Sequence, residues 1–136
     1  MQDRPSAAEL LATIGEYLDQ DVLPLMQGAL RYHTLVAANL VAVLEREVLA
    51  GTGPLRQERR ELVELLGVPG PDPAADDVDA DLLHLNGALQ DRLLAPELPD
   101  RDFLVAARDV LERAVLAKLA VNKPGYDRYD MAVEVP

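Results

Sequence analysis

The chain has 136 residues, 49% of them hydrophobic, which is long enough for one domain with a core of its own. Its net charge of −11 repels phosphate backbones and anionic lipid, and this argues against nucleic-acid binding and membrane-surface binding. The absence of cysteine excludes disulfides, thiolate catalysis and cysteine-bound metals.

The first half of the chain predicts two helices. Ser6 and Glu9 have the spacing of a capping box, and apolar residues then recur at helical spacing to about Asp21. Pro24 interrupts this pattern, and a longer helix is expected over 29–50. Because that helix is apolar on all sides over 34–44, except at Asn39, we expect it to be buried among the others.

Three further helices are predicted after Gly51, over about 54–67, 77–93 and 100–121. Within the second of these, Asn86 and Gly87 could instead form a turn. A proline- and aspartate-rich loop is expected at about 68–78. The tail at 123–136 is expected to be short and extended. It could pair with a partner's sheet edge, remain disordered or fold over its own bundle. The predicted fold is therefore all-α: a single-domain bundle of about five helices over 1–136, arranged around the buried central helix.

Charged residues in the third and fourth helices have ordinary interpretations. Arginines at 56, 59 and 60 alternate with glutamates, which favours a solvated face with exposed ion pairs over a basic docking patch. The aspartates at 77–81 resemble the start of a calcium loop. The loop's glycine and bidentate glutamate positions are Leu82 and Ala88, so helix capping is the better interpretation.

The sequence shows no catalytic constellation. Ser6 is the only serine, and it is already assigned as a helix cap. The two histidines, His33 and His84, have no neighbouring metal-ligand spacing, and no phosphate-binding glycine loop occurs. We therefore expect no metal, no cofactor and no enzymatic activity. No apolar run reaches the roughly 18 residues of a membrane span, and no signal-peptide pattern is present, which predicts a soluble, cytoplasmic protein.

The polar residues of the central helix remain as candidates: Tyr32, His33, Asn39, Arg46 and Glu47. Burial of such groups requires compensating hydrogen bonds. A structural interpretation has Asn39 fixing the helix register and Arg46 pairing with a carboxylate of another helix. A functional interpretation makes the set a polar pocket or a partner-facing seam. The residues alone leave both open.

Several motifs together resemble one small bacterial family of helical domains. They are the segments Arg4–Leu11, Tyr32–Asn39 with Arg46 and Glu47, and Lys118–Pro124, and the resemblance runs to Tyr126. Such domains are found beside acyl-CoA dehydrogenases and aminoglycoside-phosphotransferase-like kinases. The resemblance implies an accessory subunit of a kinase that phosphorylates hydroxyacyl-CoA substrates, with the dehydrogenase as a further partner. It adds Lys118, Asn122 and Tyr126 to the candidate partner- or ligand-binding residues.

Two other functions remain as alternatives. The first is a small-molecule or acyl-CoA binding module, for which the acidic surface is unfavourable because coenzyme A needs cationic contacts. The second is a small enzyme that uses His33 with Arg46 or Glu47 as acid and base. The apolar helix also leaves room for a homodimer through exposed helix faces.

Overall fold

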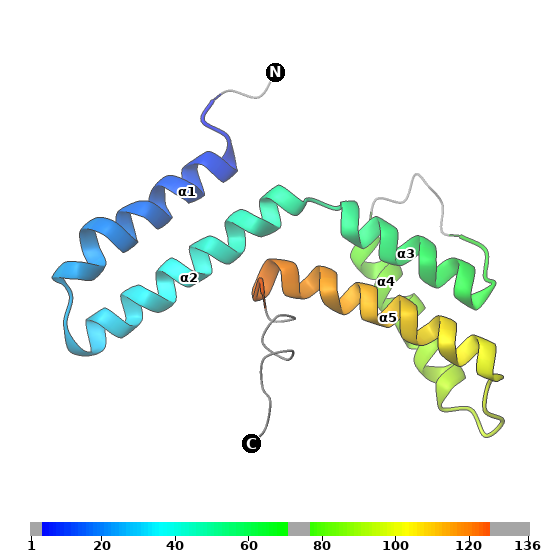
Figure 1. Ribbon diagram of the computed structural model, residues 1–136. Coiled ribbons are helices and arrows are strands. Elements are labelled where there is room, and N and C mark those ends of the chain that lie inside the picture. Colours follow the sequence, from blue (N-terminus) through cyan, green and yellow to red (C-terminus); the bar gives the residue numbers. More distant parts are fainter. Residues whose placement is uncertain (1–3, 71–76, 126–136) are drawn as a thin grey trace. The chain divides into compact units, whose positions relative to one another are not determined.

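The computed structural model describes residues 4–70 and 77–125, and these residues form five α-helices without any strand (Figure 1). The α-helices are α1 (Ala7–Tyr17), α2 (Gly28–Ala50), α3 (Gly53–Leu66), α4 (Val78–Leu93) and α5 (Arg101–Asn122). A π-helical turn, Leu18–Val22, and a 3₁₀ turn, Leu23–Leu25, connect α1 to α2. The all-α class and the five helices are confirmed, and α4 continues through Asn86 and Gly87 without a turn.

By its contacts the chain divides into two compact units, Met1–Gly51 and Thr52–Pro136, called unit 1 and unit 2 below. Unit 1 contains α1 and α2, and unit 2 contains α3, α4 and α5. The expectation of one domain spanning 1–136 stays a prediction. Of the predicted 68–78 loop, the part at 71–76 lies outside the described residues, as does the tail from 126 onward.

Unit 1 is a helical hairpin in which α1 packs against α2. Half-buried residues of α1 recur at helical spacing and are mostly small: Ala8, Leu11, Ala12 and Gly15. A Cβ added at Gly15 would lie 3.7 Å from the side chain of Val41 on α2, which is ordinary van der Waals contact. Small side chains on this face therefore let the two helices approach closely.

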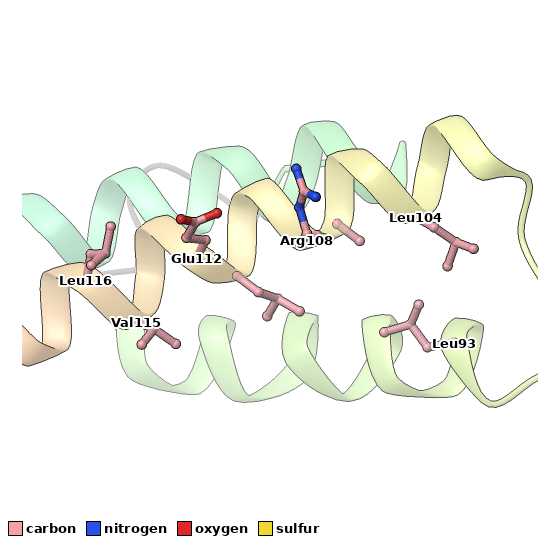
Figure 2. A pocket seen from close by; sticks show the side chains of 8 residues that line it. Leu93, Leu104, Arg108, Glu112, Val115 and Leu116 are labelled. Carbon is pink, nitrogen blue, oxygen red and sulfur yellow. The ribbon is translucent and has the colours of Figure 1, made fainter. Parts of the chain in front are cut away.

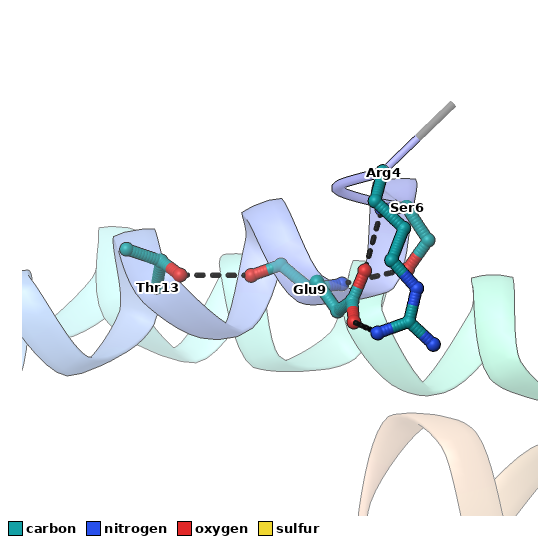
Figure 3. A network of polar contacts seen from close by, with 4 residues as sticks. All are labelled: Arg4, Ser6, Glu9 and Thr13. Atoms are coloured by element: carbon teal, nitrogen blue, oxygen red, sulfur yellow. Dashed lines mark hydrogen bonds and ion pairs between the residues drawn. The ribbon is translucent and has the colours of Figure 1, made fainter.

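The predicted capping box is present at the start of α1 (Figure 3). The Ser6 amide donates to Glu9 Oε2 at 2.7 Å, and the Glu9 amide donates to Ser6 Oγ at 3.3 Å. Arg4 lies 3.8 Å from the same carboxylate, and the Thr13 hydroxyl donates to the Glu9 carbonyl at 2.9 Å. Hydrogen bonds from the backbone and the side chain of Ser6 lower the pKa of Glu9.

Substituting Ser6 with alanine should destabilise the first turn of α1 by about 1 kcal/mol, because the Glu9 amide loses its acceptor. Since the pKa of Glu9 is lowered by folding, the contribution of its carboxylate is present at neutral pH and is lost as the pH falls through the lowered value. Amide hydrogen exchange of residues 7–10 between neutral and acidic pH measures both effects. Thr13→Ala, which removes an exposed hydroxyl from the same helix, should leave these exchange rates almost unchanged.

Within unit 1, the central helix is not buried on all sides as the sequence predicts. Ala38 is the only buried residue of α2. On the side of the helix away from Ala38, Val36, Leu40 and Leu44 are 40%, 56% and 48% exposed. Within unit 1, α2 packs against α1 and the turns that follow it, and these can cover only one of its faces.

The hydrophobic core lies in unit 2 and comes from all three of its helices. Leu62 of α3 is the most deeply buried side chain, at 1% exposure. It clusters with residues spaced three or four apart on α4 and α5: Val78, Leu82, Leu85, Leu89, Phe103, Ala107 and Val110. The guanidinium of Arg92 lies 3.9 Å from the ring centroid of Phe103, and this cation–π contact links α4 to the core residue Phe103 of α5.

Side-chain caps begin α4 and α5 as the sequence predicts. Asp77 accepts from the amide of Ala80 at 2.9 Å, and Asp100 accepts from the amide of Phe103 at 2.8 Å. Both carboxylates therefore lie at the positive end of a helix, where the macrodipole favours them. At the end of α3, Gly67 adopts a left-handed conformation with φ 64°, which suits glycine because it has no Cβ.

Candidate functional site

The polar residues predicted as a candidate site lie spread along the length of α2. Tyr32 and His33 are exposed neighbours, with ring centroids 5.9 Å apart and planes tilted by 60°. Asn39 and Glu47 are exposed and Arg46 is half-buried. The premise that these groups are buried in a core is therefore wrong.

The spacing along α2 also bears on the acid–base hypothesis. His33 lies thirteen residues before Arg46 and fourteen before Glu47, which corresponds to about 20 Å along the helix at 1.5 Å per residue. One small substrate cannot contact both ends of that distance on a single chain. The helix therefore does not bring His33 within hydrogen-bonding reach of either predicted partner.

Lys118 forms an ion pair within unit 2, and its candidacy as a partner- or ligand-binding residue stays a prediction. Its ammonium lies 3.3 Å from Glu58 Oε1, joining α5 to α3. Glu58 is only 8% exposed, whereas the Lys118 side chain is 58% exposed. The pair balances the charge of a carboxylate at the edge of the core, which is a structural role. Asn122 is the last residue of α5 and is exposed, and Tyr126 lies outside the described residues.

An open apolar groove of about 550 Å³ runs between α4 and α5 (Figure 2). Leu93 of α4 and Leu104 and Val115 of α5 point into the space between the two helices. The remaining lining residues all belong to α5: Ala107, Arg108, Leu111, Glu112 and Leu116. Leu104, Leu111, Val115 and Leu116 are 39–52% exposed, so the groove presents a contiguous apolar surface to solvent.

Arg108 and Glu112 provide the polar edge of this groove. The guanidinium of Arg108 donates to Asp109 Oδ1 at 2.9 Å, and this contact raises its pKa further. Because Arg108 is already engaged by its neighbour, it is a poor anchor for a free phosphate. The groove is therefore better suited to an apolar occupant than to the nucleotide part of coenzyme A.

A second groove, of about 530 Å³, lies between α3 and α5 and is acidic. Its carboxylates come from Glu61, Glu64, Asp102 and Asp109, and Arg113 is its only cation. Arg113 Nε lies 3.0 Å from Glu61 Oε2. A hydrogen bond from Gln57 and then the contact with Arg113 hold the pKa of Glu61 below its usual range. Glu61 therefore stays ionised at neutral pH and ties α3 to α5.

His84 lines a smaller cavity of about 370 Å³, with Val68, Pro69, Asp81, Leu85 and Ala88. Asp81 is engaged there by Arg59, whose Nη1 lies 2.8 Å from Asp81 Oδ2. Among residues 4–70 and 77–125, no group of three or more histidine and carboxylate side chains could hold a metal ion. In the same part of the chain, no helix is long and apolar enough to cross a membrane.

Neither the α4–α5 groove nor the burial of Glu58 is predicted by the sequence. Leu104, Leu111 and Val115 lie on or next to the helical face of α5 that carries the core residues, so their spacing favours burial over exposure. Glu58 stands in a run of charged residues that is typical of a solvated surface. Glu58 lies three residues after Leu55 and four before Leu62, at helical spacing within the apolar stripe of α3, and this spacing is the signal that could have identified its burial.

Comparison with family models decides the relationship of the chain. A domain of unknown function, DUF6285, matches residues 24–126. The chain belongs to the DUF6285 family. The match begins after α1, so the Arg4–Leu11 segment lies outside it, and it includes α2 and all three helices of unit 2. No match was found among curated proteins or among solved structures.

Proposed function

We propose that this protein is a non-catalytic accessory subunit of an aminoglycoside-phosphotransferase-like kinase that acts on hydroxyacyl-CoA in acyl-CoA catabolism. The kinase would carry the nucleotide chemistry, and this protein would complete, stabilise or regulate it. The proposal rests on the family resemblance of the sequence, with an acyl-CoA dehydrogenase as a further candidate partner. The proposed site of action is the cytoplasm, which fits a chain without cysteine.

The observation that carries the proposal is the exposed apolar groove between α4 and α5. The groove exposes a contiguous strip of leucine and valine side chains, with the charged Arg108 and Glu112 at one edge. Such a strip is typical of an interaction surface. Residues of α2 offer further exposed aromatic and polar contacts at Tyr32, His33 and Asn39. A partner-binding role fits these separate surfaces better than a single enclosed catalytic pocket.

Reconstitution with an aminoglycoside-phosphotransferase-like kinase that acts on hydroxyacyl-CoA tests the proposal. We expect phosphorylation of a 4-hydroxyacyl-CoA to rise at least tenfold when this protein is added to the purified kinase. Leu116→Asp should weaken the effect, because it places a charge in the groove. Leu83→Asp is the matched control, because Leu83 is 78% exposed and does not line the groove. Full activity of the kinase alone would contradict the proposal.

The apolar lining of the same groove favours one alternative, a module that binds an acyl chain. Calorimetric titration of this protein with acyl-CoAs of increasing chain length separates the two functions. Binding that strengthens with each added methylene, at about 0.8 kcal/mol per buried group, would support the alternative. No heat with any acyl-CoA, combined with kinase activation, would support the accessory role.

A further inference from the structure

The outer face of α2 has a pattern that is symmetric about Leu40. His33, Val36, Leu40, Leu44 and Glu47 fall on one side of the helix, opposite the side on which Ala38 is buried. Val36 and Leu44 each lie four residues from Leu40, and His33 and Glu47 each lie seven residues from it. The stripe is therefore apolar at its centre, with a base at one end and an acid at the other.

We infer that two copies of this chain associate through this face, with their α2 helices antiparallel and Leu40 on the twofold axis. In a twofold interface, the contact that residue i makes with residue j is repeated as j with i. Leu40 then meets Leu40 of the second copy, and Val36 meets its Leu44. The 3–4 spacing of the stripe is the spacing by which long helices pack at a shallow angle.

Charge complementarity supports a second copy as the occupant. The same pairing places His33 of each copy opposite Glu47 of the other, at both ends of the interface. These two residues are about 21 Å apart on one chain, so only an antiparallel partner brings them together. A parallel pairing would instead place like residues side by side, including the two Glu47 carboxylates.

The distribution of charge along the chain removes the main objection to self-association. The whole chain carries −11, which opposes association of two copies. Helix α2, however, contains two arginines and two glutamates, and no charged residue lies between 34 and 44. The face that would be shared is thus free of the acidic excess. With the helices of unit 1, the pairing gives a four-helix arrangement of two hairpins.

This inference goes beyond the proposed function, because it concerns self-association and requires no kinase. The chain has no cysteine, so a single introduced thiol can cross-link only to its counterpart in another copy. A thiol on the twofold axis lies near its symmetry mate, within the few ångströms that a disulfide requires. Under mild oxidation of the full-length protein, Leu40→Cys should form a covalent dimer rapidly.

Leu35→Cys is the matched control. Leu35 is on the same helix and has nearly the same exposure, 53% against 56% for Leu40, but lies about 140° away around the helix axis. We expect Leu35→Cys to cross-link at least tenfold more slowly. Equal rates for the two variants, or no covalent dimer with Leu40→Cys, would overturn the inference. Circular dichroism of both variants shows whether the helices are retained.

Sedimentation of the wild-type protein gives an independent test. We expect a species of twice the 14.8 kDa chain mass that dissociates on dilution. His33→Glu should raise the dissociation constant at least tenfold, since it places two carboxylates together, and adding Glu47→Lys should restore association. A monomer at every concentration would overturn the inference and leave this face to another segment of the chain or to a different protein.

Discussion

Replacing Leu62 with alanine should lower the free energy of unfolding of unit 2 by about 2–5 kcal/mol. Leu62 is 1% exposed and belongs to the cluster that joins α3 to α4 and α5. The substitution removes buried methyl groups and leaves a cavity that the three helices cannot fully close. Urea unfolding followed by circular dichroism measures the change, and amide hydrogen exchange of α4 assigns it to unit 2.

Leu83→Ala is the control for this experiment, because it makes the same chemical change on an α4 side chain that is 78% exposed. The free energy of unfolding of Leu83→Ala should stay within about 0.5 kcal/mol of that of the wild-type protein. If the two variants unfold at the same urea concentration, Leu62 is not at the centre of the core. Faster exchange confined to α1 and α2 would contradict the assignment to unit 2.

Replacing Arg59 with methionine should destabilise unit 2 by about 2–4 kcal/mol. The Arg59 and Asp81 side chains are 14% and 22% exposed, and their closest atoms are 2.8 Å apart, linking α3 to α4. Methionine retains much of the apolar stem, so the loss comes mainly from leaving the Asp81 carboxylate without its cation. Thermal unfolding at neutral pH, together with hydrogen exchange across the start of α4, measures it.

Arg60→Met is the matched control for Arg59→Met. Arg60 is the next residue of α3, is exposed, and donates to Gln57 within its own helix. Exposed contacts of this kind contribute little, so the variant should unfold within about 0.5 kcal/mol of the wild-type protein. An equal loss in both variants would show that helix propensity rather than the pair with Asp81 is responsible.

Arg59 and Arg60 are adjacent in the sequence, but only Arg59 pairs with a residue of another helix, and the sequence did not predict this difference. Both residues belong to the same charged run of α3, and the sequence predicts exposed ion pairs for all of it. Arg60 is exposed as predicted, although it donates to the neutral Gln57, whereas Arg59 forms a largely buried pair with a residue twenty-two positions later. Which of two adjacent arginines faces a neighbouring helix depends on how the helices pack, and local spacing does not contain that information.

Local interactions explain why the helices themselves could be predicted. The capping box of Ser6 and Glu9, the caps of Asp77 and Asp100, and the left-handed Gly67 involve residues within four positions of one another. Such contacts form in the same way whatever the rest of the chain does. The all-α class and most helix boundaries therefore followed from the sequence, whereas α1 ends at Tyr17 and gives way to a π-helical turn before the predicted end at about Asp21.

For the candidate site, the residues of α2 could be named from the sequence, but their surroundings could not. Tyr32, His33, Asn39 and Glu47 are exposed and spread over the helix, and Lys118 is paired with Glu58. The α4–α5 groove depends on residues such as Leu93 and Leu104, which come from different helices. Contacts of this range exist only once the helices have packed.

The sequence by itself determined that this protein is helical, where most of its helices begin and end, and that α2 is apolar on more than one face. Only the tertiary structure decided that the core lies in unit 2, around Leu62, and that α2 keeps its outer face exposed. The physical reason is that apolar periodicity records which faces favour burial, whereas the burial itself depends on the number of packing partners within reach. In unit 1, α1 and the connecting turns cover only one face of α2, and Leu40 lies on the face that they leave open.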